Sequence, residues 1–220
     1  KYDHHSYRNS SIKNYLKALE FLSSENIYSV RMGKTNEEKI QSKNNFIIDY
    51  SNSKFKSDFL DLYIPYKCMF WIGGEVGIQM TSKTFRKPIV SVNRVPMFAN
   101  NLSAGILKKE NVTIWKHYYD LNQKKFLSIS EIKKRKIGSL QTTEEYKKNK
   151  ISIIENSSEE IFMATNQLYN MLNGKMIFGK EYYKLEEEFW KLYGLNDYNN
   201  EYISTTLCYE YLQKNKHLMN

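Results

Sequence analysis

Proline and glycine are scarce in this chain, which has only 3 prolines and 9 glycines among 220 residues. Disordered linkers and low-complexity segments are rich in these residues, so neither is expected over any long stretch. Hydrophobic residues make up 41% of the sequence, which is enough for a proper core. We therefore expect one ordered globular domain over residues 1–220, without internal repeats.

Cysteines and long apolar runs are also few. The two cysteines, Cys68 and Cys208, provide neither a disulfide framework nor the spacing of metal ligands. No apolar run approaches the roughly 18 residues that a membrane-spanning helix needs. A reducing cytoplasm is the expected compartment.

Acidic residues are outnumbered, because 24 Asp and Glu face 33 Lys and Arg, for a formal net charge of +9. The excess is concentrated in residues 108–150, notably in KKRK at 133–136 and YKKNK at 146–150. A solvated helix face is one interpretation, and peripheral contact with a polyanion or with the inner face of a membrane is the alternative. The sequence has no helix-turn-helix pattern and no aromatic RNA-binding signature, so nucleic acid is not an expected partner.

Hydrophobic patterns predict strands that alternate with helices. We expect strands over 27–32, 45–48, 68–72 and 89–92, with helices over 11–24, 58–63 and 76–82. Such alternation is typical of βαβ units, so the expected fold is α/β, a Rossmann-like parallel sheet flanked by helices. For the rest of the chain we expect a strand over 112–119, a strand followed by a Ser-x-x-Glu capping box within 151–161, and helices over 130–136, 143–149, 159–172, 181–193 and 204–214.

A glycine-containing stretch, KCMFWIGGEVGIQMTS at 67–82, joins the third expected strand to a helix. Glycines allow the backbone to approach an anion, and free N–H groups at a helix start can bind phosphate. The candidate phosphate-binding residues are Gly73, Gly74, Glu75, Val76 and Gly77. Their spacing matches neither GxGxxG nor a P-loop, so an ordinary tight turn remains the alternative.

Parallel strands place their following loops along one sheet edge, where ligands bind in open α/β sheets. Polar residues of these loops suit a nucleotide diphosphate with a ribose. The candidates are Arg31, Gly33, Ser51, Ser53, Asp58 and Asn93. Alternatives remain open for two of them: Arg31 could form a salt bridge at a strand end, and Asp58 could stabilise a helix start.

Several blocks together resemble a family of bacterial glycosyltransferases of the GT-B type, found near genes for surface polysaccharides and sugar modification. The matching blocks are SYRNSSIKNYLKALEFL (6–22), VRMGK (30–34), IIDYSNSKFKSDFLDLYI (47–64), CMFWIGGEVGI (68–78), FRKPIVSVNRVP (85–96), EEYKKNKISIIENSSEEI (144–161) and YISTTLCYEYLQKN (202–215).

The resemblance implies that this chain is the donor-binding half of a two-domain enzyme. An acceptor domain, a first strand with a His-x-Arg-Asp-like motif and the catalytic base would then precede it. The implied partners are a nucleotide-diphosphate sugar and a glycan or lipid-linked acceptor, with no cofactor and no metal. Arg8 and Arg31 would stabilise the leaving diphosphate, and His5 would lie opposite the sugar, although a flexible terminus is the alternative for His5.

One residue departs from the family pattern. Relatives usually carry small or hydroxylated residues where this chain has Glu75, whose carboxylate would repel a diphosphate. Glu75 would then face a ribose or base, pair with a cation such as Arg8 or Arg31, or indicate an altered activity. Two rival functions also stay open. One is a GT-B-like sugar-nucleotide epimerase or hydrolase, and the other is a non-enzymatic basic module that binds a polyanion or a membrane.

Overall fold

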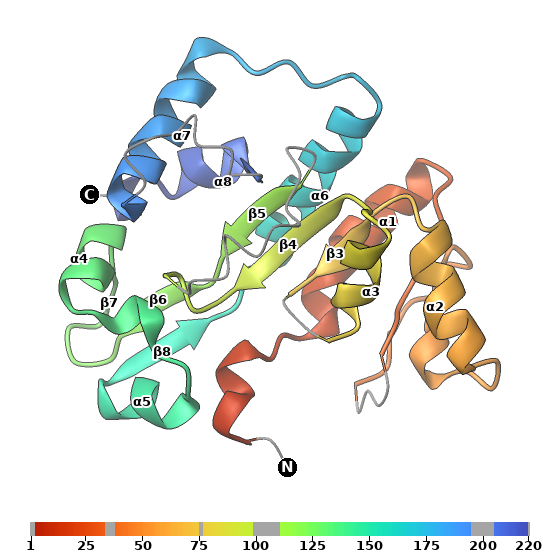
Figure 1. Ribbon diagram of the computed structural model, residues 1–220, viewed down its shortest axis with the longest axis horizontal. Helices are drawn as coiled ribbons and strands as arrows, with labels where there is room; N and C mark the ends of the chain where they lie inside the picture. The colour runs from red at the N-terminus through yellow and green to blue at the C-terminus, as the bar shows by residue number, and fades with distance from the viewer. Residues whose placement is uncertain (1–2, 34–37, 75–76, 99–110, 195–204, 220) are drawn as a thin grey trace.

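Four parallel strands form the central sheet of the computed structural model, which describes residues 3–33, 38–74, 77–98, 111–194 and 205–219 (Figure 1). In spatial order they are β3 (Trp71–Gly73), β4 (Ile89–Arg94), β5 (Val112–Trp115) and β9 (Thr206–Leu207). All six residues of β4 are buried, as expected for a strand with neighbours on both edges and helices on its faces. The mixed α/β fold with a parallel sheet flanked by helices is therefore confirmed.

Two smaller sheets accompany the central one. β1 (Ser29–Val30) and β2 (Ile47–Ile48) pair in parallel, and β6 (His117–Asp120) lies antiparallel between β7 (Lys125–Phe126) and β8 (Ile151–Ile154). β1 and β3 are thus both edge strands among the described residues. The expectation of a single parallel sheet is wrong in this respect.

The predicted strand over 112–119 is in fact two strands in different sheets. The amide of Lys116 donates to the carbonyl of Arg94, and the chain then leaves β4 to enter the antiparallel sheet. The register between β4 and β5 shifts near this point, where Asn93 adopts a left-handed backbone with φ of 55°. An unbroken run of β-forming residues gave no sign of this division.

Helices cover the sheet and extend beyond it. α1 (Leu16–Ser24) packs against α6 (Ser158–Leu172), which also contacts β4 and β5 (Figure 1). α2 (Asp58–Lys67) packs against α3 (Gln79–Thr84) at the other end of the sheet. The remaining helices are α4 (Ile129–Lys134), α5 (Thr143–Lys148), α7 (Lys180–Tyr193) and α8 (Tyr209–Lys214), with short 3-10 helices η1 (Asp3–Arg8), η2 (Ile12–Tyr15), η3 (Tyr50–Asn52), η5 (Ile137–Ser139) and η6 (Lys216–Leu218).

Side-chain caps explain several helix starts. Ser157 with Glu160, and Thr142 with Glu145, form reciprocal capping boxes at α6 and α5, close to the starts expected from these motifs. A third box, Ser128 with Glu131, opens α4. Each box satisfies free amide groups at the helix start, so the local sequence determines where the helix begins.

Most element boundaries differ by a few residues from the predicted ones, and two of the differences have a clear physical cause. α2 continues through Pro65 to Lys67, because a proline in the last turn removes one hydrogen bond while the amide of Cys68 still donates to Ile64. The helix expected over 204–214 starts only at Tyr209. The amide of Thr206 donates to the carbonyl of Asn111, which adds the strand β9 to the edge of β5.

The core lies between the central sheet and its helices and is rich in aromatic residues, including the almost fully buried Trp115, Tyr118 and Trp190. Within the described ranges, every helix is too short or too polar to traverse a lipid bilayer.

Candidate functional site

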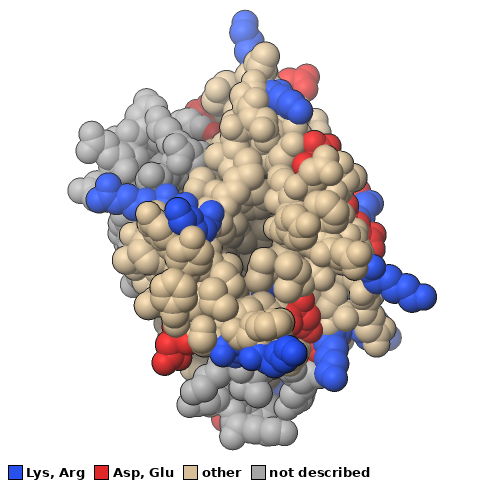
Figure 2. Space-filling model, turned by 90° about the vertical axis from the view of Figure 1, so that its right-hand side faces the viewer, with Lys and Arg blue, Asp and Glu red and all other residues tan. Residues whose placement is uncertain are grey.

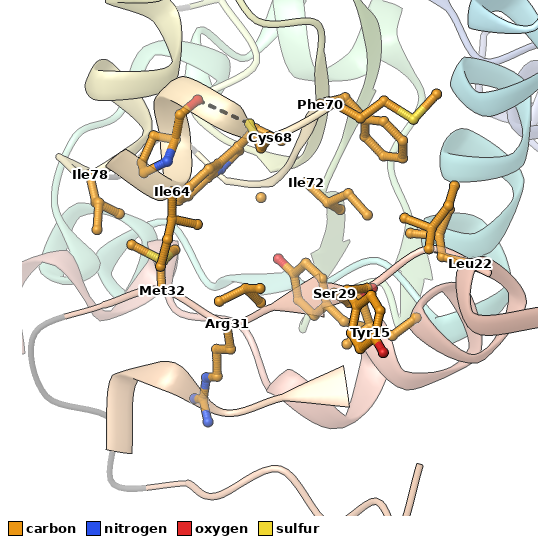
Figure 3. A pocket seen from close by; sticks show the side chains of 18 of the residues that line it. Tyr15, Leu22, Ser29, Arg31, Met32, Ile64, Cys68, Phe70, Ile72 and Ile78 are labelled. Carbon is orange, nitrogen blue, oxygen red and sulfur yellow. Dashed lines mark hydrogen bonds between the residues drawn. The ribbon is translucent and has the colours of Figure 1, made fainter. Parts of the chain in front are cut away.

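A cavity of about 490 Å³ lies between β1 and β3 (Figure 3). Residues 27–32 form one wall, residues 67–74 form the opposite wall, and Tyr15, Leu19 and Leu22 reach it from the η2–α1 segment. Ligand pockets in proteins usually have volumes of about 300–1,000 Å³, and they prefer the strand ends of open parallel sheets. This cavity is therefore the leading candidate site within the described part of the chain.

Three of the predicted site residues line this cavity: Arg31, Gly73 and Gly74. Figure 3 shows the guanidinium of Arg31 directed away from the cavity. It lies 3.6 Å from the carboxylate of Asp49 and donates to the carbonyl of Glu38. Arg31 thus contributes its stem and backbone to the cavity wall, and its charge forms the strand-end salt bridge that the sequence left open.

The Arg31 partner, Asp49, sits in a dense hydrogen-bond network. Burial would raise the pKa of Asp49, but bonds from Asn52, Ser51 and the amide of Ile40, together with the Arg31 charge, lower it below its usual value. The hydroxyl of Ser51 donates to Asp49 over 2.8 Å. Ser51 therefore stabilises the β1–β2 edge and does not line the cavity.

Sequence reasoning missed three polar groups of the cavity wall. Ser29 Oγ and Trp71 Nε1 are buried and have no hydrogen-bond partner among the described residues. Lys67 Nζ lies 5.1 Å from the centre of the Tyr66 ring, and its side chain also lines the cavity. Such groups could not be recognised from a motif, because Ser29 and Trp71 begin two different strands and Lys67 ends a helix.

Gly73 has a specific packing reason at the end of β3. A Cβ atom at this position would lie 3.0 Å from Trp71 Nε1, so glycine allows the indole ring to fold over the strand end. Gly74 approaches the carbonyl of Val92, which a Cβ would meet at 3.5 Å. These glycines support the local backbone path whether or not a phosphate binds.

The helix whose start was expected to bind phosphate begins later than predicted, and it is short. α3 begins at Gln79 and has six residues, and its N-cap Ile78 makes no side-chain cap. Gly77 is exposed and does not line the cavity, whereas Glu75 and Val76 lie outside the described residues. Phosphate binding by this segment stays a prediction.

Gly33, Ser53 and Asp58 also lie outside the cavity lining. Gly33 has a positive φ of 144° after β1, and its carbonyl accepts a hydrogen bond from Lys56. Ser53 follows η3. Asp58 occupies the first turn of α2, where its negative charge interacts favourably with the positive end of the helix dipole. Their proposed contacts with a nucleotide stay predictions.

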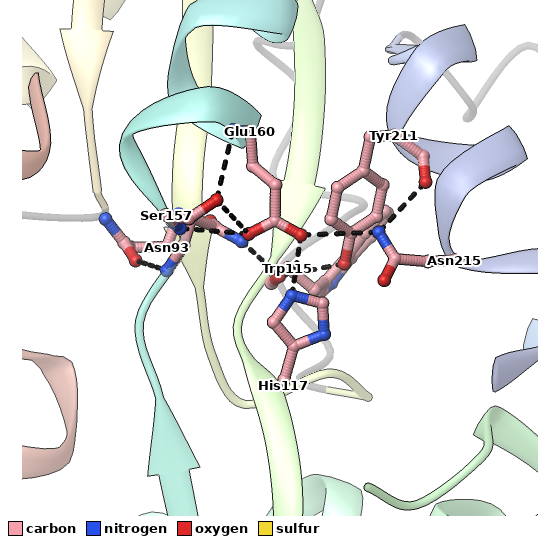
Figure 4. Close-up of polar contacts among 8 residues, drawn as sticks. Asn93, Trp115, His117, Ser157, Glu160, Tyr211 and Asn215 are labelled. Carbon is pink, nitrogen blue, oxygen red and sulfur yellow. Dashed lines mark hydrogen bonds and ion pairs between the residues drawn. The ribbon is translucent and has the colours of Figure 1, made fainter. Parts of the chain in front are cut away.

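Asn93 is buried and its side chain joins two elements (Figure 4). Its amide donates to Asn156 Oδ1 over 2.6 Å, and its own Oδ1 accepts from the amide of Asn156 over 2.7 Å. Asn156 Nδ2 donates to the carbonyl of Trp115 over 2.8 Å. The structure thus gives Asn93 a role in holding β4 to the segment between β8 and α6.

A buried His117–Glu160 pair lies near this junction, with 2.8 Å between Nε2 and Oε1 (Figure 4). Burial would raise the pKa of Glu160, but the hydrogen bond and charge of His117, with donors from Ser157 and Asn215, lower it to about 2. The adjoining cavity of about 30 Å³ can hold a water molecule but no metabolite. This pair is better explained as structural than as catalytic.

His5 and Arg8 belong to η1, which packs against α5. The ring of Tyr7 lies 5.1 Å from that of Tyr146, and Arg8 Nε donates to the hydroxyl of Tyr7. Neither His5 nor Arg8 lines the β1–β3 cavity, so the structure does not bring the proposed catalytic pair and the cavity residues together.

A buried lysine holds this N-terminal segment in place. Lys116 Nζ donates to the carbonyls of Tyr7 and Asn9, and burial lowers the pKa of Lys116 to about 8 despite the nearby charge of Glu155. Glu155 in turn accepts a hydrogen bond from the amide of Ser11. These contacts tie η1 and the residues after it to Lys116, directly before β6, and to Glu155, directly after β8.

Within the described ranges, no three His, Cys, Asp or Glu side chains gather closely enough to hold a metal ion. Comparison with protein-family models, with curated proteins and with solved structures finds no match to this chain. The resemblance to glycosyltransferases therefore rests on the sequence blocks alone and remains a prediction.

Proposed function

We propose that the chain binds a nucleotide-diphosphate sugar and serves as the donor-binding domain of a GT-B glycosyltransferase. The sugar would pass to a glycan or lipid-linked acceptor held by another domain. This proposal joins the sequence resemblance to an α/β fold with parallel strands, the architecture on which nucleotides commonly bind.

The cavity between β1 and β3 is the observation that carries the proposal. Its mainly apolar walls suit a base and a ribose, and its lining includes Ser29 and Trp71, whose buried polar atoms have no hydrogen-bond partner among the described residues. A buried polar group without a partner costs about 1–3 kcal/mol, so a ligand that supplied partners would recover part of this cost. Heteroatoms of a base or a ribose hydroxyl could do so.

Lys67 is the cation best placed to meet a diphosphate in this cavity. Its ammonium group contacts the rings of Tyr63 and Tyr66 rather than a carboxylate of the described residues. The Arg31 guanidinium, by contrast, faces Asp49 and stabilises the edge of β1. We therefore assign charge stabilisation of the leaving diphosphate to Lys67 and scaffold support to Arg31.

A thermal-shift screen against UDP, GDP, CMP, ADP and dTDP tests the proposal. One nucleotide at a concentration of about 100 times its Kd should stabilise the fold by about 2.7 kcal/mol, a rise in Tm of roughly 5–10 °C. The variants Ser29→Ala and Lys67→Ala should each reduce this rise. Lys147→Ala on α5, far from the cavity lining, is the matched control and should leave it unchanged.

The absence of a shift with every nucleotide would remove the donor-binding assignment. A shift that survives both cavity variants would place the nucleotide elsewhere on the chain. If binding is found, incubation with the corresponding nucleotide sugar separates two chemistries. Release of free sugar without an acceptor would favour the hydrolase, whereas transfer that requires an acceptor would favour the glycosyltransferase.

A further inference from the structure

The outer face of α2 is unusually apolar for a solvent-exposed helix. Phe59, Leu62, Tyr63 and Tyr66 recur at helical spacing on this face, with exposed fractions of 68%, 57%, 43% and 49%. Phe55 precedes the helix and is 68% exposed. An apolar stripe at this spacing normally faces a core, so its exposure indicates a surface that binds something.

Aromatic contacts extend this stripe to Phe85, at the end of α3. The rings of Phe59 and Tyr63 stack with centroids 5.3 Å apart, Tyr63 approaches Tyr66 at 6.4 Å, and Tyr66 meets Phe85 at 5.3 Å. We call these residues the α2 patch: Phe59, Leu62, Tyr63 and Tyr66 on α2, Phe85 after α3, and Phe55 before α2. Ring contacts join four of them, Phe59, Tyr63, Tyr66 and Phe85, into one surface.

Cations accompany the α2 patch. Lys54 lies 5.4 Å from the ring centre of Phe55, and Lys87 lies 5.9 Å from that of Tyr66. Residues 54–87 contain six Lys and Arg but three Asp and Glu. The side of the molecule that carries α2 shows uncharged side chains over its centre and charged ones around its margin (Figure 2).

We propose that the α2 patch docks on the surface of an anionic lipid membrane. Phenylalanine, leucine and tyrosine side chains enter the boundary between headgroups and acyl chains, while flanking lysines meet lipid phosphates. Lysine and tyrosine suit this boundary because each has an apolar body and a polar tip. α2 lies at the outer edge of the molecule, where it can approach a flat surface (Figure 1).

A second copy of the chain fits the α2 patch less well. Lysine is depleted at protein–protein interfaces, and a symmetric dimer would place the same cations opposite one another.

Docking through the α2 patch would also bring the cavity near the membrane. Tyr63 belongs to the α2 patch and lines the cavity, so docking would bring the cavity wall close to the lipid surface.

Co-sedimentation with vesicles tests this inference. The purified chain should bind vesicles of phosphatidylcholine with phosphatidylglycerol more tightly than vesicles of phosphatidylcholine alone, and added salt should weaken binding. The double variant Phe55→Ser/Phe59→Ser should bind about tenfold or more weakly, because two exposed rings no longer enter the boundary. The double variant Lys54→Glu/Lys87→Glu should lose about thirtyfold or more on the anionic vesicles.

Two matched controls identify the surface. Leu121→Ser/Ile177→Ser removes apolar side chains that are 50% and 91% exposed elsewhere, and should leave vesicle binding unchanged. Lys147→Glu/Lys148→Glu changes the basic run on α5 by the same charge and should have a much smaller effect. An unchanged Tm verifies that each variant remains folded.

Three results would overturn the inference directly: no binding to anionic vesicles, unchanged binding by both α2 variants, or loss of binding in the α5 variant alone. A fourth would be self-association of the chain without vesicle binding, if Phe55→Ser/Phe59→Ser abolishes that self-association. The last result would instead assign the α2 patch to a second copy of the chain. None of these variants alters a residue of the cavity lining, so failure of membrane docking leaves the nucleotide proposal untouched.

Discussion

Asn156→Ala is expected to lower the free energy of unfolding by about 2–3 kcal/mol. Asn156 is fully buried, and its side chain accepts from the amide of Asn93 and donates to the carbonyl of Trp115. Alanine would leave the amide of Asn93 buried without this partner, at a cost of about 1–3 kcal/mol, whereas the carbonyl of Trp115 would keep the bond from the hydroxyl of Tyr211 at 3.0 Å. Urea unfolding followed by circular dichroism measures the loss.

Asn149→Ala is the matched control, because Asn149 is exposed at the end of α5 and makes one bond to the carbonyl of Glu145. It should cost well under about 1 kcal/mol. Similar losses in the two variants would contradict the assigned role of Asn156.

Asn93→Ala tests the structural role assigned to Asn93. This variant should lower the free energy of unfolding and leave the nucleotide-induced rise in Tm intact. If Asn93 contacted the ligand, the variant would lose this rise.

Acid is expected to destabilise the protein through Glu160. The folded pKa of Glu160 is about 2 and the unfolded value is about 4.5, so the folded state binds fewer protons than the unfolded state between them. The stabilisation is therefore complete above about pH 4.5 and is lost as the pH falls toward about 2. A shift of this size corresponds to about 3 kcal/mol, because each pKa unit is worth 1.36 kcal/mol.

Glu160→Gln isolates this contribution. Glutamine at this position can still complete the capping box with Ser157, but it removes the charge that faces His117. Unfolding free energies measured between about pH 2 and pH 6 should fall less steeply toward low pH in this variant than in the unaltered protein. Equal slopes in the two proteins would mean that Glu160 is not a main source of the acid sensitivity. Glu159→Gln, at a half-buried position of the same helix turn where the carboxylate pairs with Lys17, is the control for general charge effects.

Local sequence signals predicted much of the fold. Serine or threonine followed three residues later by glutamate indicated the starts of α5 and α6, and short apolar runs indicated β3 and β4. These signals succeed because a capping box or a buried strand depends on residues that are close together in the sequence.

Contacts between distant residues could not be predicted in this way. Nothing near Asn93 indicates that its partner is Asn156, which lies 63 residues away. The run 112–119 likewise gives no local sign that Lys116 will turn away from the central sheet toward the carbonyls of Tyr7 and Asn9. Tertiary pairing decided both cases.

The candidate site was predicted only in part for the same reason. The rule that loops after parallel strands gather along one edge of the sheet identified Arg31, Gly73 and Gly74. It could not show that the Arg31 guanidinium turns toward Asp49, nor that Ser29 and Trp71 would line the same cavity. Side-chain direction depends on neighbours that a single sequence does not specify.

The separation of β1 from β3 has a consequence for local unfolding. β1 and β2 pair over only two residues each, and of these four residues only Ile47 is buried. This edge should therefore open more often than the fully buried β4, and its amides should exchange with solvent sooner. A ligand that fills the cavity would contact both sides of the gap and restrain that opening. Slower exchange across residues 27–32 would then report cavity occupancy even before any chemistry is observed.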